Sequence, residues 1–209
     1  MKKLFWLVYF FALNATVFAQ KGQHALGITL SSSIATQGLG NSQTGEFQVP
    51  ISPSGGVYYD WNFSRKIGLN MGANFRIETQ RVLGFCFNCF GSGQFKYIYQ
   101  TVEFPVNLAI NLNGKETADV KMYFLAGYTY SYLLSFVGKD LQYDIEYDYM
   151  EQFGVLRNNH FLNLAFEGRH NIKDKFTVGF SPFARILLSQ PLEGGTSYVG
   201  LALKFGRII

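Results

Sequence analysis

The chain has 209 residues, of which 48% are hydrophobic and 17% aromatic, whereas only 15% carry a charge. Soluble domains usually have about 25% charged residues, yet the mean hydropathy here is only +0.05. A helical membrane protein needs runs of about 20 apolar residues, and none follows the N-terminal segment. The apolar residues therefore alternate with polar ones, which argues against a helical membrane protein and is typical of a membrane β-barrel.

The first residues have the pattern of a secretory signal peptide. Lys2 and Lys3 are followed by an apolar stretch over residues 4–13 and by Val17-Phe18-Ala19, a small-residue cleavage site before Gln20. The alternative, a membrane anchor helix, is disfavoured because the apolar run is short. We predict a signal peptide over 1–19 and a mature domain over 20–209. Removing the two lysines brings the net charge close to neutral, which gives no reason to expect a nucleic-acid partner.

The mature chain contains eight segments in which apolar and polar residues alternate. Such a period of two indicates β-strands with one apolar and one polar face. In the third segment, for example, Ile67, Leu69 and Phe75 alternate with Asn70 and Asn74. The predicted strands cover residues 23–36, 55–63, 67–80, 95–111, 120–136, 157–170, 176–188 and 196–206. Pro105 and Pro182 lie inside two of them, and we expect bulges or local edges there because proline removes a ladder hydrogen bond.

The segment 120–136 shows the pattern most clearly. Its predicted outward residues are Val120, Met122, Phe124, Ala126, Tyr128, Tyr130, Tyr132, Leu134 and Phe136. A row of this length needs an extended apolar partner, and lipid can provide it. A soluble lipocalin-type or sandwich protein also alternates, but its second face is charged and wet. Here the second face is rich in Gly, Ser, Thr, Asn and Tyr, which favours the membrane barrel.

The predicted connectors alternate in length. Residues 64–66, 113–119 and 172–175 form short turns, whereas 37–54, 81–94 and 138–156 form long loops and 189–195 a shorter one. Outer-membrane barrels have short periplasmic turns and longer outside loops. An even strand count therefore places the N-terminal and C-terminal ends of the barrel domain in the periplasm. A wider, ten-stranded barrel is the alternative, because the tyrosine-rich stretch 143–150 could form another hairpin.

Nine charged residues are predicted to face the lumen. Eight strands enclose a lumen just wide enough for side chains to fill, and an unpaired charge away from water is costly. We therefore expect acids and bases to pair as an internal plug. An ion or solute pathway along Arg76, Arg169 and Arg185 is the alternative. The predicted lumen network comprises Asp60, Arg76, Glu78, Glu103, Lys121, Glu167, Arg169, Arg185 and Lys204.

Cys86 and Cys89 form a C-x-x-C pair in the predicted loop 81–94. Such a pair can be a redox motif, half of a zinc site or a disulfide at a loop tip. The sequence offers no second Cys pair or nearby His to complete a zinc site, and redox versions lie at a helix start. In an exported protein we therefore expect a loop disulfide, with free thiols as the alternative.

The sequence offers weak signals for catalysis or metal binding. His24, His160 and His170 have no metal-ligand spacing with one another or with a Cys. The stretch 140–151 carries five acidic residues and three tyrosines, which could recruit a hard cation or a partner protein. It lacks the spacing of an EF-hand, so we expect a solvated acidic loop. We predict no enzymatic activity and no cofactor.

The chain resembles the small outer-membrane β-barrel family of Bacteroidota that is often labelled PorT-like. The resemblance covers residues 20–209 and rests on Ala19-Gln20, on Thr101-Val-Glu-Phe-Pro-Val-Asn-Leu108, on Phe124-Leu-Ala-Gly-Tyr-Thr-Tyr130 and on Tyr198-Val-Gly-Leu-Ala-Leu-Lys-Phe205. It implies an outer-membrane location and an association with protein-secretion or gliding machinery. The family has no catalytic motif, so the resemblance assigns no functional residue.

Together these patterns predict an all-β protein: an eight-stranded, antiparallel, up-and-down transmembrane β-barrel, exported by its signal peptide to the outer membrane. The expected role is structural or one of interaction, with outside loops that contact protein partners and no assigned small-molecule ligand. The competing function is that of a small-solute porin or transporter.

Overall fold

The computed structural model describes residues 23–36, 51–85, 92–113, 120–141, 143–148, 150, 157–173, 175–188 and 197–209, with the backbone alone described for 80–85 and 92–95. The predicted signal peptide and the pair Cys86 and Cys89 lie outside the described residues. Within them, no helix has the length and hydropathy needed to cross a bilayer.

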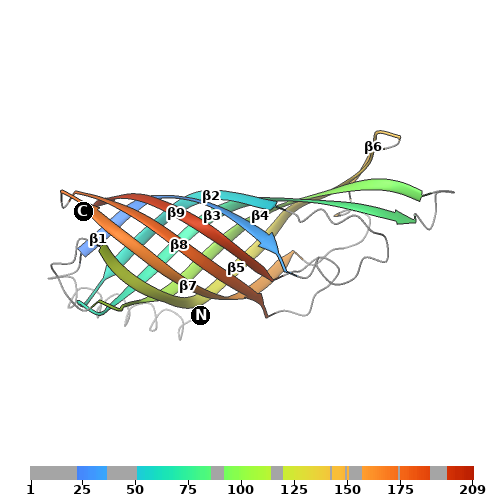
Figure 1. Cartoon of the computed structure of the whole chain (residues 1–209). Coiled ribbons are helices and arrows are strands. Elements are labelled where there is room, and N and C mark those ends of the chain that lie inside the picture. The colour runs from blue at the N-terminus through green and yellow to red at the C-terminus, as the bar shows by residue number, and fades with distance from the viewer. Residues whose placement is uncertain are drawn as a thin grey trace, which may run out of the picture.

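Eight antiparallel strands close into a barrel, as the sequence predicts (Figure 1). Neighbouring strands pair in chain order, β4 pairs with β5, β5 with β7, and β9 closes the barrel against β1. The strands are β1 (Gln23–Ala35), β2 (Ile51–Asn62), β3 (Ile67–Phe85), β4 (Ser92–Asn111), β5 (Val120–Asp140), β7 (Asn158–Ile172), β8 (Phe176–Leu187) and β9 (Tyr198–Ile208), together with a short additional strand, β6 (Ile145–Asp148).

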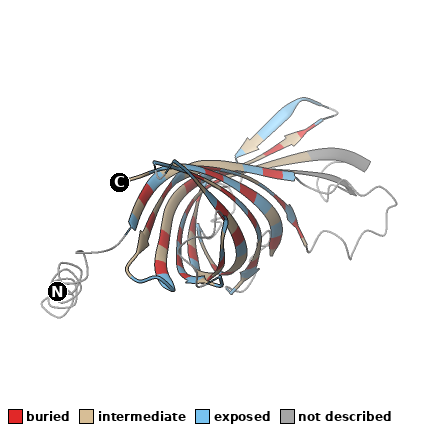
Figure 2. Ribbon diagram, turned by 60° about the vertical axis from the view of Figure 1, so that its left-hand side comes forward, coloured by how far each residue is buried: buried red, intermediate tan, exposed pale blue. Residues whose placement is uncertain are grey.

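Apolar side chains cover the outside of the barrel and polar ones fill the inside. Along β1, Leu26, Ile28 and Leu30 are each more than half exposed, whereas Thr29 and Ser33 between and beyond them are buried. The same alternation of buried and exposed positions runs along the neighbouring strands (Figure 2). A soluble protein buries such residues, so an outward apolar face on every strand of the barrel fits contact with lipid.

The two ends of the barrel differ. One end carries the short connections between β2 and β3 and between β7 and β8, and there the first residues of β1 lie beside the last residues of β9. We call it the turn end, and the opposite end the loop end. The first strand therefore begins and the last strand finishes at the turn end, in agreement with the predicted even strand count.

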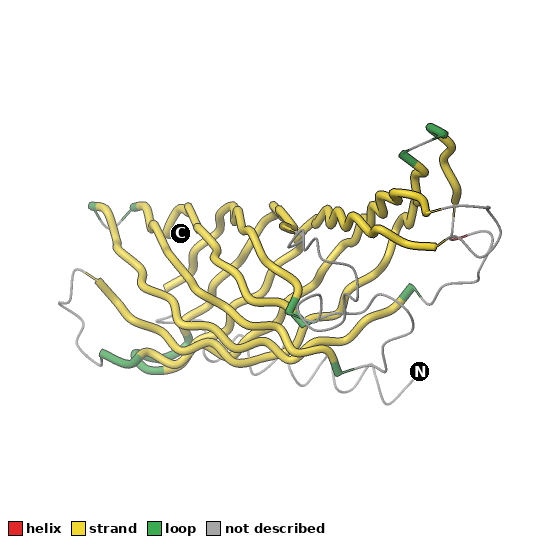
Figure 3. The backbone as a smooth tube through the Cα atoms, turned by 45° about the vertical axis from the view of Figure 1, so that its right-hand side comes forward, coloured by secondary structure: helices red, strands yellow, loops and turns green. Residues whose placement is uncertain are grey.

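Three strands extend well beyond the barrel at the loop end. The predicted loop 81–94 is wrong in part, because β3 continues to Phe85 and β4 begins at Ser92. The predicted loop 138–156 is also wrong in part, because β5 continues to Asp140 and pairs there with β6. We call residues 79–85, 92–98, 137–141 and 143–148 the ledge (Figures 1 and 3). The ten-stranded alternative is wrong, since β6 pairs with β5 in the ledge and not in the barrel wall.

A bulge reverses the faces of β5 where the ledge begins. The register between β4 and β5 shifts between Gln100 and Thr101, which leaves one extra residue on β5. Phe136 therefore lies opposite Tyr99, and the two rings stack with centroids 4.4 Å apart. Tyr99 and the buried Thr101 are two residues apart on β4 and therefore share its inward face. Because Phe136 lies opposite Tyr99, it is on this inward face too, and its predicted outward position is wrong.

The prolines interrupt their ladders without a change of register. Pairing of β3 with β4 passes from Met71↔Val106 to Asn74↔Glu103, and the residues beside Pro105 are skipped. Pairing of β7 with β8 likewise skips the residues beside Pro182. The predicted local edges are therefore present, whereas the predicted bulges at the prolines are wrong.

The lipid-facing surface gives a first testable prediction. Leu203, the middle residue of β9, lies opposite Leu30 and Phe180, and all three side chains are exposed. We expect Leu203→Arg to lower the free energy of unfolding by about 2–4 kcal/mol, because arginine at the bilayer midplane is poorly solvated. The matched variant Ile67→Arg, at the turn end, should cost only about 0–1 kcal/mol. Urea titration in lipid vesicles measures both, and equal losses would contradict a membrane-embedded face.

Candidate functional site

Eight of the nine predicted lumen charges lie buried in the barrel, and ion pairs and hydrogen bonds link them. They form two groups along the barrel axis. The turn-end cluster comprises Asp60, Glu167, Arg169 and Lys204, and the loop-end cluster comprises Arg76, Glu78, Glu103 and Arg185. Each cluster contains two acids and two bases, so each is formally neutral.

Glu167 is the centre of the turn-end cluster. Its carboxylate is fully buried and accepts hydrogen bonds from Arg169 Nε at 2.8 Å and from Lys204 Nζ at 2.6 Å. The same guanidinium reaches Asp60 Oδ2 at 3.0 Å. Four charges from β2, β7 and β9 thus neutralise one another inside the wall of the barrel.

Glu103 has the same role in the loop-end cluster. Its carboxylate, also fully buried, pairs with Arg76 Nε at 3.2 Å and with Arg185 Nη1. Glu78 accepts a hydrogen bond of 2.8 Å from the hydroxyl of Tyr198, and the Arg76 guanidinium lies 4.0 Å from the centroid of that ring. Removing a carboxylate that holds two cations would leave both of them buried and unpaired.

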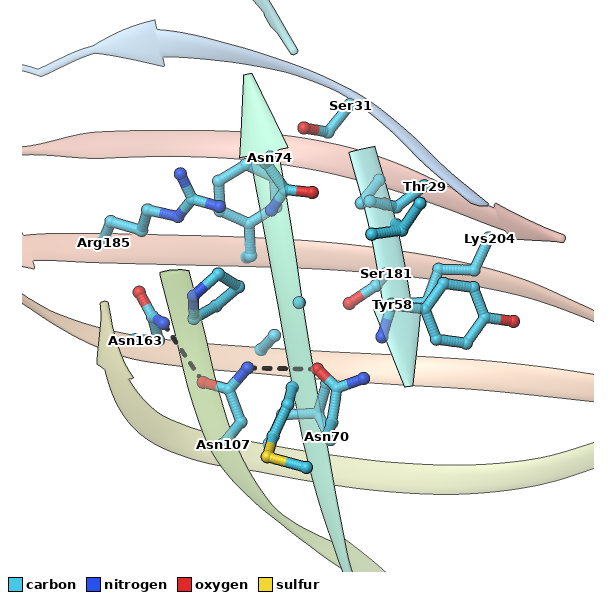
Figure 4. A pocket seen from close by; sticks show the side chains of 18 residues that line it. Thr29, Ser31, Tyr58, Asn70, Asn74, Asn107, Asn163, Ser181, Arg185 and Lys204 are labelled. Carbon is cyan, nitrogen blue, oxygen red and sulfur yellow. Dashed lines mark hydrogen bonds between the residues drawn. The ribbon is translucent and has the colours of Figure 1, made fainter. Parts of the chain in front are cut away.

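A row of side-chain amides crosses the lumen between the clusters (Figure 4). Asn163 donates to Asn107 at 3.1 Å, Asn107 donates to Asn70 at 3.2 Å, and Asn70 donates to Asp60 at 2.6 Å. Asn163 also donates to Thr129 at 2.5 Å. The amides therefore connect β7, β4, β3 and β2 and end on the turn-end cluster.

A polar cavity with a volume of about 70 Å³ adjoins the amide row. Its lining includes Arg185 on one side and Lys204 on the other, so it lies between the two clusters (Figure 4). Asn74 Oδ1 and Asn163 Oδ1 belong to lining residues, are buried and have no protein hydrogen-bond partner. Because about 10–15 Å³ accommodates one water molecule, the cavity has room for several.

Lys121 is the predicted lumen charge that does not join a cluster. It is half-buried at the turn end, where it lines a small second cavity of about 10 Å³ together with Arg169 and Tyr123. The described part of the chain contains no ion pair to its ammonium group. Its place near the start of β5 explains this, since water at the turn end can solvate it.

The lumen network predicted from the sequence comprises charged residues alone and leaves out the inward-facing aromatic residues that contact them. The rings of Tyr123 and Tyr58 lie 4.6 Å from Arg169 and 5.1 Å from Lys204, in cation–π contact. A Cβ atom on Gly206 would collide with the hydroxyl of Tyr58, so a larger residue at this position would displace that ring. The alternation could have revealed these contacts, because Tyr58 lies two residues from Asp60 and Tyr123 two residues from Lys121, on the same face of each strand.

His24 lies on β1, whereas His160 and His170 share β7, so the expectation that the three lie on separate strands holds only for His24. His24 Nδ1 lies 2.6 Å from the hydroxyl of Tyr59, and its ring stacks on Trp61 near the turn end. His160 contacts Tyr128 and lies beside Tyr130, nearer the loop end. Aromatic and amphipathic rings of this kind are typical of the two girdles of a membrane barrel.

Part of the predicted acidic loop belongs to the ledge. Lys139 Nζ lies 2.5 Å from Asp144 Oδ1, and this contact raises the pKa of the Lys139 ammonium group. Asp140 is buried, and Asp148 accepts a hydrogen bond from the backbone of Met150. Among the described residues, no group of three or more His, Cys, Asp or Glu side chains could hold a metal ion. The acidic residues of the ledge are thus dispersed over a turn and two strand edges.

The clusters give a second prediction. Replacing Glu103 by Gln removes the carboxylate that pairs with both Arg76 and Arg185 and leaves Glu78 as the only acid of the loop-end cluster, which should lower the free energy of unfolding by about 3–5 kcal/mol. The matched control Lys121→Gln removes a half-buried charge outside the clusters and should change stability by less than about 0.5 kcal/mol. Urea titration of both variants in vesicles checks this. Similar losses for both would mean that Glu103 is not an essential counter-ion.

A scan against protein-family models found no matching family, and a search of curated proteins found no match. Solved structures do match over most of the chain. The outer membrane protein OprG from Pseudomonas aeruginosa aligns over 90% of this chain and 93% of its own, with a TM-score of 0.55 and 10% sequence identity.

Two other outer-membrane proteins align with lower TM-scores. Neisserial surface protein A (NspA) has a TM-score of 0.46 and 8% identity over 90% of this chain and 99% of its own. Ail of Yersinia pestis, in complex with the heparin analogue sucrose octasulfate, has a TM-score of 0.45 and 10% identity over 90% of this chain and 96% of its own. Because the sequence identity is only 10%, the likeness to OprG shows the fold alone. The chain has the fold of a small outer-membrane β-barrel, and this fold supports a location in the outer membrane.

Proposed function

We propose that this protein is a closed, non-enzymatic barrel of the outer membrane that serves as a structural and interaction component. The observation that carries the proposal is the occupied lumen. Glu103 and Glu167, each fully buried, hold two cations apiece on either side of the central cavity. A solute would have to separate these pairs, and each separated charge would lose its counter-ion in a low-dielectric space.

The ledge is the surface best suited to a protein partner. It projects from one side of the loop end (Figure 3). Exposed apolar side chains lie at its tip. Tyr143 is 61% exposed and Ile145 is 47% exposed, and both lie beyond the barrel wall. Exposed aromatic and aliphatic groups on a rigid sheet are typical anchors of protein interfaces.

The partner is, in this proposal, a component of a protein-secretion or gliding complex. Support comes from the resemblance of residues 20–209 to the PorT-like barrels and from a fold that offers surface but an occupied lumen. Gel filtration in mild detergent, followed by mass spectrometry of co-purifying proteins, tests this. Recovery of the barrel alone from native membranes would contradict the proposal.

A second candidate function is passage of small solutes, and the polar cavity is the observation that favours it. The lining carries two amide oxygens without protein partners, so water can occupy the middle of the lumen. Passage would further require both ion-pair clusters to open.

Conductance discriminates between the two functions. The purified protein in planar bilayers should show no stable single-channel conductance, because both clusters occupy the lumen. A porin reconstituted in the same bilayers provides the positive control. A large and stable conductance of the wild-type barrel would establish transport and contradict the proposed closed state.

A change in the ledge should alter partner binding without altering the barrel. We expect Tyr143→Ser combined with Ile145→Ser to reduce co-purification of the partner, because both substitutions remove exposed apolar anchors. Ile209→Ser, a change of an exposed apolar residue at the turn end, is the matched control and should leave recovery unchanged. Quantitative mass spectrometry measures the ratio of partner to barrel, and equal recovery from both variants would exclude the tip of the ledge as the contact.

A further inference from the structure

The two edges of the ledge differ in whether another strand pairs with them. On one side, β6 pairs with β5 over Val137 to Asp140 and covers its edge. On the other side, pairing between β2 and β3 ends at Ser54↔Arg76, whereas β3 continues to Phe85. Within the described part of the chain, no strand pairs with β3 beyond Arg76. Residues 79–85, which follow the last contact with β2, therefore form an edge strand that pairs with β4 on one side only, and we call them the β3 edge.

The hydrogen-bond pattern identifies which residues of the β3 edge have unused backbone groups. Asn111 N–H donates to the carbonyl of Lys66 at 2.7 Å, so even-numbered residues of β3 bond to β4. The register between these strands is constant from Ile67↔Ile110 to Phe85↔Ser92, apart from the break at Pro105, and the assignment therefore extends to the end of β3. The N–H and C=O groups that are directed away from β4 beyond the last contact with β2 belong to Thr79, Arg81, Leu83 and Phe85.

The sequence of the β3 edge has little of the usual protection against strand pairing. Edges that must stay single are protected by charged side chains, especially lysine, by proline, by a bulge or by a covering element. Residues 79–85 contain one charged residue, Arg81, and no proline, and their ladder with β4 runs without a register shift. Among the described residues, the β3 edge is thus regular and has no strand beside it.

We infer that the β3 edge binds an extended segment of a partner protein by β-strand addition. In this mode, main-chain hydrogen bonds supply affinity and alternate side chains supply specificity. The inference rests on the proposed interaction function and specifies how the partner binds. The segment runs antiparallel to β3, toward the membrane, because antiparallel pairing is the more stable arrangement.

A second copy of the same chain fits this edge poorly. Two barrels in one membrane have their β3 strands pointing in the same direction, so their edges could pair only in parallel. A two-fold axis along the membrane normal would also place equivalent residues at equal heights, whereas the bonding residues of parallel strands alternate along the ladder. A flexible segment of a different protein has neither restriction.

Hydrogen exchange of the purified barrel in lipid tests whether the edge is available. Amides of Thr79, Arg81 and Leu83 should exchange rapidly, whereas those of Glu78, Gln80 and Val82 should be protected by β4. Protection of both sets in the purified protein would show that the chain covers its own edge, and the inference would be wrong.

Photo-crosslinking in intact cells tests the binding mode, with a photoreactive amino acid at position 79 as the probe. A site-specific crosslink to one segment of one partner is expected. Arg81→Pro combined with Leu83→Pro removes two edge N–H groups but no bond to β4 and should reduce the crosslink about tenfold or more. The matched control, Arg81→Ala combined with Leu83→Ala, retains both N–H groups and should keep the crosslink. Retention in the proline variant, or loss in both variants, would overturn strand addition.

A probe at position 143, at the tip of the ledge, separates this inference from the proposed function. A partner crosslinked at 143 but not at 79 would support the interaction role and overturn strand addition. No crosslink at either position, together with recovery of the barrel alone from native membranes, would overturn both.

Discussion

The structure depends on one constraint, which is that charges enclosed by a lipid-coated wall must neutralise one another. Glu103 and Glu167 meet it in the same way, because each carboxylate is fully buried and contacts two cations. The eight-stranded barrel is narrow enough for side chains from opposite walls to touch. The same contacts that satisfy the charges occupy the lumen, so the electrostatic requirement and the closed state have a common origin.

The barrel could be predicted from the sequence because lipid imposes a strict period of two on every strand. The outward positions of β1 and the inward positions of Asp60, Arg76 and Glu103 follow from that alternation alone. The partners of these charges could not be predicted, since Arg185 and Glu103 are 82 positions apart and meet only through closure of the barrel. Lys121 lies outside both clusters because it is close to the turn end of the barrel. The alternation of apolar and polar residues does not reveal how far along the barrel axis a side chain lies.

The ledge was missed because its strands continue without the signal that identifies the others. Above the lipid, both faces of a sheet can be polar, so residues 81–85 and 92–94 lose the contrast between apolar and polar positions. The reversed face of Phe136 has a related cause. A bulge adds one residue to β5, and the uninterrupted series Tyr132, Leu134 and Phe136 gives no sign of it. Local pairing, which decides both features, is not encoded in the period of one strand.

The location of the ion-pair partners also bears on how the barrel enters the bilayer. Glu167 and Arg169 lie two residues apart on β7, and Arg76 pairs with Glu103 across the hairpin formed by β3 and β4. These segments therefore carry counter-ions of their own before the remaining strands arrive. The strands β8 and β9 contribute only cations to the clusters, Arg185 and Lys204, and these reach their carboxylates when the cylinder seals. Charge compensation thus couples the insertion of the hairpin formed by β8 and β9 to closure of the barrel. Before closure, the other strands carry unpaired acidic groups, which attract the cations of this hairpin.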